Sequence, residues 1–226
     1  MSHIAENLRH VRSAIEQACQ RARRDPSSVT LVAVSKTFPA QAIQRAWDAD
    51  QRDFGESRQQ EGSPKVAALP TDCRWHFIGV LQRNKARKVL ADFDFIHSVS
   101  SQRLAESISR IASETNQQPS LFLEVNLANE ESKGGLTPDE LLSQFPEIAA
   151  LPAIHLRGLM AIPPASDDPE DSRPWFRKLR ELRDTLETRH DHPLPDLSMG
   201  MSHDFPIAIE EGATIVRVGS AIFGKR

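Results

Sequence analysis

Eight short apolar runs recur along the chain, and stretches with helical character separate them. A strand followed by a helix, repeated in this way, predicts a parallel sheet, and eight repeats are typical of a sheet that closes into a barrel. Such a barrel needs roughly 200 to 250 residues, and the chain has 226. We therefore predict an α/β fold with a single (β/α)8 TIM-type barrel as one domain, residues 1–226, with an open doubly wound sheet as the alternative. The predicted strands are Thr30–Val34, Arg52–Phe54, Trp75–Ile78, Phe93–His97, Leu121–Asn126, Ile154–Leu159, Asp196–Ser198 and Thr214–Val218.

Helix signals fill the intervals between these strands. An apolar stripe at Ile4, Leu8, Val11 and Ile15 predicts an extra amphipathic helix before the first strand. Proline or a hydroxyl side chain marks the start of several later helices. These helices are predicted at Pro39–Asp50, Ser101–Ser113, from Thr137–Pro138 onward, at Pro169–Arg189, and from near Asp204.

Composition narrows the class of protein. Hydrophobic residues make up 39% and charged residues 26%, as in an ordinary globular protein. The formal charge of -3 is spread along the chain, so we expect no nucleic-acid partner, and no apolar run is long enough to span a membrane. Cys19 and Cys73 show no metal-ligand spacing, which favours a reduced, cytoplasmic setting. We also expect no metal site: His190 and His192 have no third ligand at a useful spacing.

Lys36 follows the apolar strand Thr30–Val34, at the strand end where α/β barrels keep their chemistry. An amine in an apolar mouth loses its proton more readily, and a neutral amine forms a Schiff base with an aldehyde. A solvated lysine at a strand end is the alternative.

The loops after the last two predicted strands have the composition of a phosphate site. The first runs from Leu197 to Ser202 and the second from Arg217 to Gly224. Glycine allows close approach of the backbone to an anion, and serine hydroxyls donate hydrogen bonds. In barrels, the loops after strands 7 and 8 frequently bind phosphate. Together with Lys36, these loops predict a phosphate-bearing aldehyde as the ligand.

Arg217 adds a constraint on that ligand. Strand alternation puts Ile215, Arg217 and Gly219 on one side of the last strand, so the guanidinium projects toward the site. An arginine opposite a pyridine nitrogen would keep that nitrogen unprotonated, because guanidinium only donates hydrogen bonds. An arginine paired with a carboxylate outside the barrel is the alternative.

Six ordered sequence blocks resemble the pyridoxal phosphate homeostasis protein family over nearly the whole chain. The blocks are Ala33–Thr37, Trp75–Lys85, Glu131–Gly135, Arg157–Ile162, Ser198–Asp204 and Arg217–Gly224. The resemblance implies a barrel like the N-terminal domain of alanine racemase, with pyridoxal 5'-phosphate (PLP) held as a Schiff base on Lys36.

The resemblance also implies the other cofactor contacts. Ser202, Gly219 and Ser220 would contact the phosphate with Met201 beside them, and Arg217 would lie near the pyridine nitrogen. The family's usual asparagine is replaced here by Ser57, which we predict as a weaker cofactor contact. For Lys133 the sequence predicts a contact with the cofactor or with partners and no further role.

Three functions fit these residues. The preferred one is a protein that binds PLP for intracellular PLP homeostasis, a monomer with PLP-dependent apoenzymes as possible partners and no catalytic residues of its own. The chain contains no tyrosine, so the tyrosine base of a two-base racemase is missing. The second is a PLP enzyme of low activity, a racemase or lyase, with His76 and His203 as candidate bases. The third is a Schiff-base aldolase without PLP.

Overall fold

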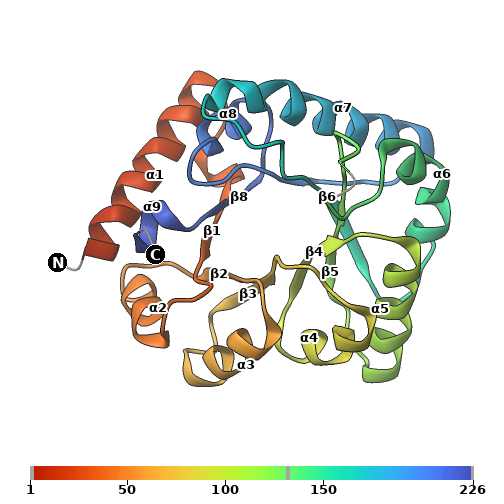
Figure 1. Cartoon of the computed structure of the whole chain (residues 1–226), viewed down its shortest axis with the longest axis horizontal. Coiled ribbons are helices and arrows are strands. Elements are labelled where there is room, and N and C mark those ends of the chain that lie inside the picture. The colour runs from red at the N-terminus through yellow and green to blue at the C-terminus, as the bar shows by residue number, and fades with distance from the viewer. Residues whose placement is uncertain (1–2, 131–132, 225–226) are drawn as a thin grey trace.

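The computed structural model describes residues 3–130 and 133–224. Its eight parallel strands pair in chain order and close into a barrel, in which β8 also pairs with β1 (Figure 1). The predicted barrel fold is confirmed, and each predicted strand overlaps an observed one. The strands are β1 Thr30–Val34, β2 Asp53–Glu56, β3 Arg74–Phe77, β4 Phe95–Val99, β5 Ser120–Glu124, β6 His155–Met160, β7 Asp196–Ser198 and β8 Ile215–Val218.

Helices surround the barrel (Figure 1). Most follow a strand in the chain, as the βα pattern requires. They are α1 His3–Arg21, α2 Ala40–Trp47, α3 Gln59–Ala68, α4 Ala86–Asp92, α5 Gln102–Thr115, α6 Pro138–Ala149, α7 Arg173–His190, α8 Phe205–Glu210 and α9 Ser220–Phe223. A short 3-10 helix, Pro169–Ser172, precedes α7.

The predicted helix before the first strand is α1, and it completes the ring of helices. It packs between α8 and α2 and also contacts α9. The helix that follows β8 spans only four residues, so α1 occupies the place that a longer eighth helix would take. Its buried face contains Leu8, Val11 and Ile15, the predicted apolar stripe.

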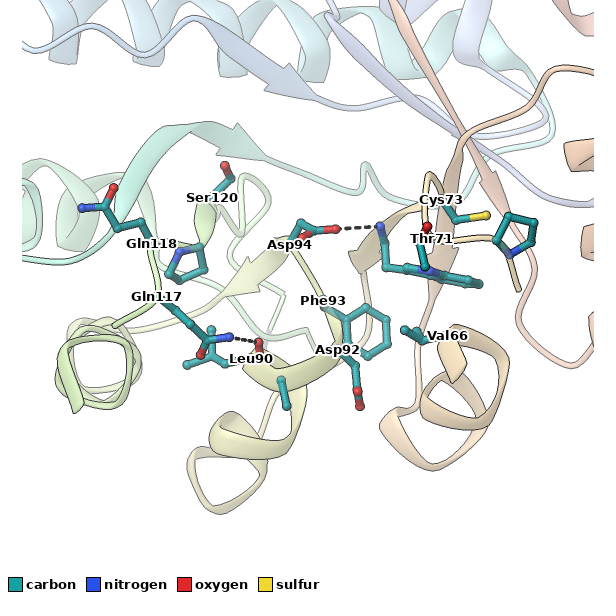
Figure 2. Close-up of a pocket in the computed structure, with 14 residues that line it drawn as sticks. Val66, Thr71, Cys73, Leu90, Asp92, Phe93, Asp94, Gln117, Gln118 and Ser120 are labelled. Carbon is teal, nitrogen blue, oxygen red and sulfur yellow. Dashed lines mark hydrogen bonds between the residues drawn. The ribbon is translucent and has the colours of Figure 1, made fainter. Parts of the chain in front are cut away.

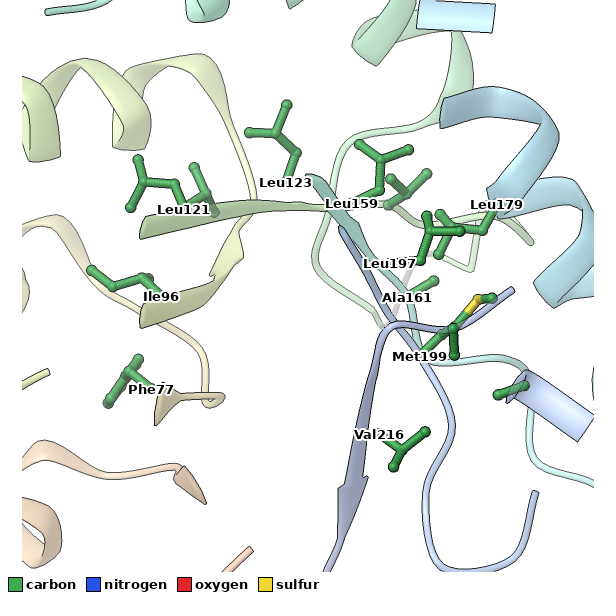
Figure 3. Packing of buried hydrophobic residues seen from close by; sticks show 14 of the residues in the cluster. Phe77, Ile96, Leu121, Leu123, Leu159, Ala161, Leu179, Leu197, Met199 and Val216 are labelled. Atoms are coloured by element: carbon green, nitrogen blue, oxygen red, sulfur yellow. The ribbon is translucent and has the colours of Figure 1, made fainter. Parts of the chain in front are cut away.

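The larger part of the core lies between the strands and the helices. Outward-facing side chains such as Leu121, Leu159 and Leu197 pack there against the helices (Figure 3). Inside the barrel, a small second cluster contains Val32, Phe122, Met160 and Ile215. Phe95 packs against this cluster. The interior also contains polar side chains such as His76, His97 and Arg217, which is unusual because most barrels of this type fill the interior with branched apolar residues.

The helix starts follow the sequence signals. Ser101 caps α5, and its side chain accepts a hydrogen bond from the amide of Leu104. Thr137 and Glu140 form a complete capping box at the start of α6. None of the helices described here has the length and apolar character that a bilayer-crossing helix needs.

Candidate functional site

A cavity of about 530 Å³ opens at the carboxyl end of the barrel. Six of the seven residues predicted as cofactor contacts line it: Lys36, Met201, Ser202, Arg217, Gly219 and Ser220. They come from the loops after β1 and β7 and from the end of β8 and the residues after it. The barrel therefore brings together residues that lie up to 184 positions apart in the chain.

Lys36 is partly buried and stands two residues beyond the end of β1. Val34 and Phe38, two residues before and two residues after Lys36, also line the cavity. Phe38 stacks on Phe223 of α9 with ring centroids 5.2 Å apart. Thr37 has a positive φ of 71°. This left-handed conformation is strained for a β-branched residue, and such strain is typical of functional loops.

The hydroxyl of Ser202 links the two predicted phosphate loops. Its Oγ accepts hydrogen bonds from the amide of Gly219 at 3.2 Å and from that of Ala221 at 3.4 Å. Ser202 thus accepts both bonds and keeps its own hydroxyl proton for donation, at the edge of the cavity that Ser202, Gly219 and Ser220 line. Two serine hydroxyls and a glycine at one edge suit an anion.

Asp204 fixes the loop after β7. Its carboxylate accepts hydrogen bonds from the amide of Met201 at 2.7 Å and from the hydroxyl of Ser172 at 3.0 Å. Gly200 has a positive φ of 90°, and a Cβ there would lie 2.6 Å from the Cβ of Ala208. The tight turn that presents Met201 and Ser202 therefore requires glycine at position 200.

Arg217 lies inside the barrel, on the same side of β8 as Ile215, as strand alternation predicts. Its side chain donates hydrogen bonds to Oγ of Ser198 at 2.6 Å and to the carbonyl of Ala161 at 3.1 Å. Burial lowers the pKa of Arg217 to about 10, and the charges of Asp204 and Glu124 act in the opposite direction. The guanidinium therefore remains charged at neutral pH.

A buried cluster supports the backbone behind Lys36. Oε1 of Glu56 accepts hydrogen bonds from Nζ of Lys65 and from Oγ of Ser35, each at 2.7 Å. Nζ of Lys65 also donates to the carbonyl of Ser35 at 3.0 Å. Burial raises the pKa of Glu56, although the hydrogen bonds from Lys65 and Ser35 oppose that rise. The residue before Lys36 is thereby held by both its side chain and its carbonyl.

Ser57 differs from the other predicted contacts. It lines a separate cavity of about 190 Å³ together with Arg58 and Leu81. Strand β2 ends at Glu56, so alternation does not carry Ser57 into the barrel. The main chain of Ser57 instead packs closely against Gly79, where an added Cβ would lie 2.0 Å from the carbonyl oxygen of Ser57.

Lys133 lies beyond β5 and outside the lining of the main cavity. Its amine donates hydrogen bonds to Glu130 at 2.7 Å and to the carbonyl of Pro163 at 3.2 Å. Glu131 and Ser132, which belong to the same sequence block, lie outside the described residues. Lys133 thus joins the loop after β5 to the loop after β6.

Other lining residues were not predicted as contacts. Ile78, Ile162 and Phe38 add apolar surface, and His203 lines the rim, where its Nε2 lies 3.1 Å from the carbonyl oxygen of Asp167. Phe38 could have been suspected from its place in the same short loop as Lys36. His76, the other candidate base, is buried inside the barrel and does not line the cavity.

A second cavity, of about 490 Å³, lies where β3, β4 and β5 begin (Figure 2). Its polar groups include the Asp94 carboxylate, which accepts a hydrogen bond from the amide of Trp75, and the Gln117 amide, which donates one to the carbonyl of Leu90. Burial raises the pKa of the Cys73 thiol there to about 11, so the unreactive thiol form prevails. Among the described residues, no lysine or arginine lines this cavity.

Several known proteins are similar to this chain in sequence. The profile of the family described as alanine racemase, N-terminal domain, matches residues 2–226. A pyridoxal phosphate homeostasis protein of Aquifex aeolicus is 45% identical over 225 residues, which cover 99% of each chain. That of Escherichia coli is 40% identical over 230 residues, covering 100% of this chain and 98% of its own.

Two solved structures are similar to this chain in fold. The structure of PipY from Synechococcus elongatus with PLP bound superposes with a TM-score of 0.86 at 40% identity, covering 98% of this chain and 100% of that one. An alanine racemase of Clostridium difficile matches with a TM-score of 0.71 at 14% identity, covering 95% of this chain and 59% of its own. The second likeness concerns the fold alone.

Proposed function

Because the chain belongs to the pyridoxal phosphate homeostasis protein family, within the family of alanine racemase N-terminal domains, we propose that it binds PLP in the cavity beside Lys36 and serves PLP homeostasis. One observation carries the proposal: an amine, a phosphate-type donor set and a buried arginine surround a single cavity. The PLP named in the structure of its relative PipY supports the same ligand.

The residues around the cavity suit each part of PLP. Ser202, Ser220 and the amide of Gly219 would bind the phosphate, with Met201 beside them. Arg217 would face the ring nitrogen and, as a pure donor, keep it unprotonated. Apolar side chains such as Ile162 supply a surface for the ring. The separate position of Ser57 argues against direct contact with the cofactor.

Lys36 would hold PLP as a Schiff base. Its Nζ would supply the nitrogen of the carbon–nitrogen double bond, and the aldehyde oxygen would leave as water with two protons of the neutral amine. Bound PLP supplies an electron sink for carbanion chemistry. Arg217 would weaken that sink, because it donates a hydrogen bond to the ring nitrogen without protonating it. This property suits a protein that holds PLP without turning over a substrate.

Absorbance and peptide mapping test the linkage. PLP added to the protein is expected to produce an absorption band in the near ultraviolet, and borohydride is expected to fix the label on the peptide that contains Lys36. Lys36→Ala should abolish the label, whereas Lys88→Ala, which removes an exposed amine of α4, should retain it. A colourless protein that takes up no PLP with Lys36 intact would instead support the aldolase alternative.

The absence of substrate turnover is tested with amino acids. The PLP-loaded protein, incubated with several L-amino acids, should yield neither D-isomers nor products of a lyase reaction at enzymatic rates. If D-isomers form, the effect of His203→Gln on the rate tests whether His203, at the rim of the cavity, acts as the base. Formation of D-isomers would favour the low-activity enzyme.

The cellular role follows from the same site. We propose a cytoplasmic monomer that passes PLP to PLP-dependent apoenzymes. Activation of an apoenzyme by the loaded protein, measured in the presence of a phosphatase that destroys free PLP, tests direct transfer. Activation that the phosphatase abolishes would show release into solution instead. Sedimentation of the purified protein tests the oligomeric state.

A further inference from the structure

A continuous chain of buried polar groups runs along the inside of the barrel. Arg217 donates to Oγ of Ser198 at 2.6 Å, and that Oγ lies 2.7 Å from Nδ1 of His97. Nε2 of His97 lies 2.9 Å from Nδ1 of His76, whose Nε2 lies 3.0 Å from Oδ1 of Asp53. All five residues are at most 6% exposed.

This chain connects the two ends of the barrel. Asp53 is the first residue of β2, at the amino end of the strands, and is paired with the half-exposed Arg74. Arg217 lines the cavity at the carboxyl end. Between them, the His76 ring stacks on Phe95 and the His97 ring on Phe122, with ring centroids 4.3 Å apart in both pairs. Among the described residues, each ring nitrogen of His76 and His97 has its hydrogen-bond partner within this hydrogen-bond chain.

The chemistry of the two ends gives the chain one direction. Arginine can only donate hydrogen bonds, so Oγ of Ser198 accepts from Arg217 and has its own proton available for Nδ1 of His97. His97 then carries its proton on Nε2 and donates to Nδ1 of His76. His76 likewise carries its proton on Nε2 and donates to Asp53, which as a carboxylate can only accept. In this arrangement both rings are neutral and in the same tautomer.

Electrostatics agrees with this assignment. Burial lowers the pKa of His76, and it lowers that of His97 well below the ordinary value. Burial raises the pKa of Asp53, but the hydrogen bonds from His76 and Arg74 outweigh burial and leave this pKa below its usual range. The carboxylate is thus ionised and both imidazoles are neutral at pH 7.

We propose that Ser198, His97, His76 and Asp53 are positioning residues that form a one-way hydrogen-bond chain and fix the guanidinium of Arg217 for the ligand in the cavity. The polarity of this hydrogen-bond chain rests on the described contacts and on two neutral rings, while its consequence for the ligand rests on the proposed binding of PLP. Nη1 of the guanidinium is committed to Ser198 and Nη2 to Ala161, and Arg217 lines the cavity, so its remaining N–H donors are left for the ligand.

The polarity is tested without PLP, by nuclear magnetic resonance of the whole chain labelled with ¹⁵N-histidine. The spectra of His76→Gln and His97→Gln assign the two rings. Both rings are expected to show a protonated Nε2 and an unprotonated Nδ1 from pH 8 to pH 6. A proton on Nδ1 of either ring, or an imidazolium at pH 7, would overturn the proposal.

Two variants at the Asp53 end of the hydrogen-bond chain sharpen this test. Asp53→Asn replaces a pure acceptor by an amide that can also donate, so the tautomers should become mixed. Arg74→Gln is the matched control, since it removes the ion pair with Asp53 and keeps the carboxylate; its tautomers should match those of the parent. Altered tautomers in Arg74→Gln would contradict the proposal. If Asp53→Asn does not fold, the parent spectrum decides.

The consequence for the ligand has a separate readout. Ser198→Ala should weaken PLP binding about fivefold, the size expected for the loss of one hydrogen bond, and shift the absorption maximum of the bound cofactor. Ser198→Thr, which restores a hydroxyl, should reverse both changes. Unchanged affinity and colour in Ser198→Ala would overturn the positioning role. If the parent binds no PLP at all, the proposed function fails, and the tautomer test still decides whether the hydrogen-bond chain runs in one direction.

Discussion

Lys65 is the residue whose replacement most directly tests how the backbone behind Lys36 is held. Its side chain is 11% exposed and that of Glu56 is fully buried. Within the described part of the chain, the second oxygen of Glu56 has no hydrogen-bond partner. Oε1 therefore supplies the hydrogen bonds of this carboxylate, and Lys65 supplies its compensating charge.

We predict that Lys65→Met lowers the free energy of unfolding by about 3–5 kcal/mol at pH 7, because it leaves a buried carboxylate without its counter-charge. Urea denaturation measures the loss. The double variant Lys65→Met with Glu56→Leu should recover a large part of it, because an apolar pair of similar volume removes the uncompensated charge. A loss below about 1 kcal/mol in the single variant would show that the pair is not coupled in this way.

Single residues also show what the sequence could and could not predict. The sequence could place Lys36, Ser202, Gly219 and Arg217 at one cavity, because each follows or belongs to a predicted strand and strand ends converge in a barrel. It could not place Ser57 at a separate cavity, because that position depends on where β2 ends and on close packing against Gly79. Neither feature is encoded in a local pattern.

At the scale of elements, α1 stands in for an eighth outer helix. Its amphipathic stripe predicted the helix, but it could not predict the place of that helix in the ring, which follows from the shortness of α9. Asn7 connects the two, since its amide donates a hydrogen bond to the carbonyl of Ile222 at 2.9 Å. The first and last helices thus stabilise each other next to the cavity.

We therefore predict that Leu8→Ala, at a fully buried position of α1, lowers the free energy of unfolding by about 2–5 kcal/mol through the cavity that it creates. Arg9→Ala, at the neighbouring exposed position, is the matched control and should change stability by less than about 0.5 kcal/mol. Thermal and urea denaturation measure both. Equal effects of the two substitutions would mean that α1 does not pack as a structural part of the barrel.

At the scale of the whole molecule, the polar interior is the feature that sequence reasoning missed. Asp53, His76, His97, Ser198 and Arg217 all occur within or at the edges of predicted strands. Polar residues at such positions were a signal, but their alignment into one hydrogen-bond chain depends on the stagger of the strands around the closed barrel. That stagger includes an irregular register between β4 and β5. No local pattern specifies it.

The same interior makes stability depend on pH. Burial lowers the pKa of both His76 and His97 in the folded protein, while in the unfolded chain each titrates near pH 6.5. Below about pH 6.5 the unfolded chain binds more protons than the folded one, so stability is full above this pH and is lost as the pH falls. Each histidine contributes a loss of up to about 1.4 kcal/mol per pH unit.

Urea denaturation at pH 8, 7, 6 and 5 measures this dependence. The free energy of unfolding should be nearly constant from pH 8 to 7 and fall steeply toward pH 5. In His97→Gln the fall should be shallower, because one of the two buried titrating rings is gone, whereas His10→Gln, at an exposed position of α1, should retain the slope of the parent. A flat profile between pH 7 and 5 would mean that His76 and His97 bind protons as readily in the folded protein as in the unfolded chain. Two neutral rings that bridge an arginine and a carboxylate inside the barrel do not permit this.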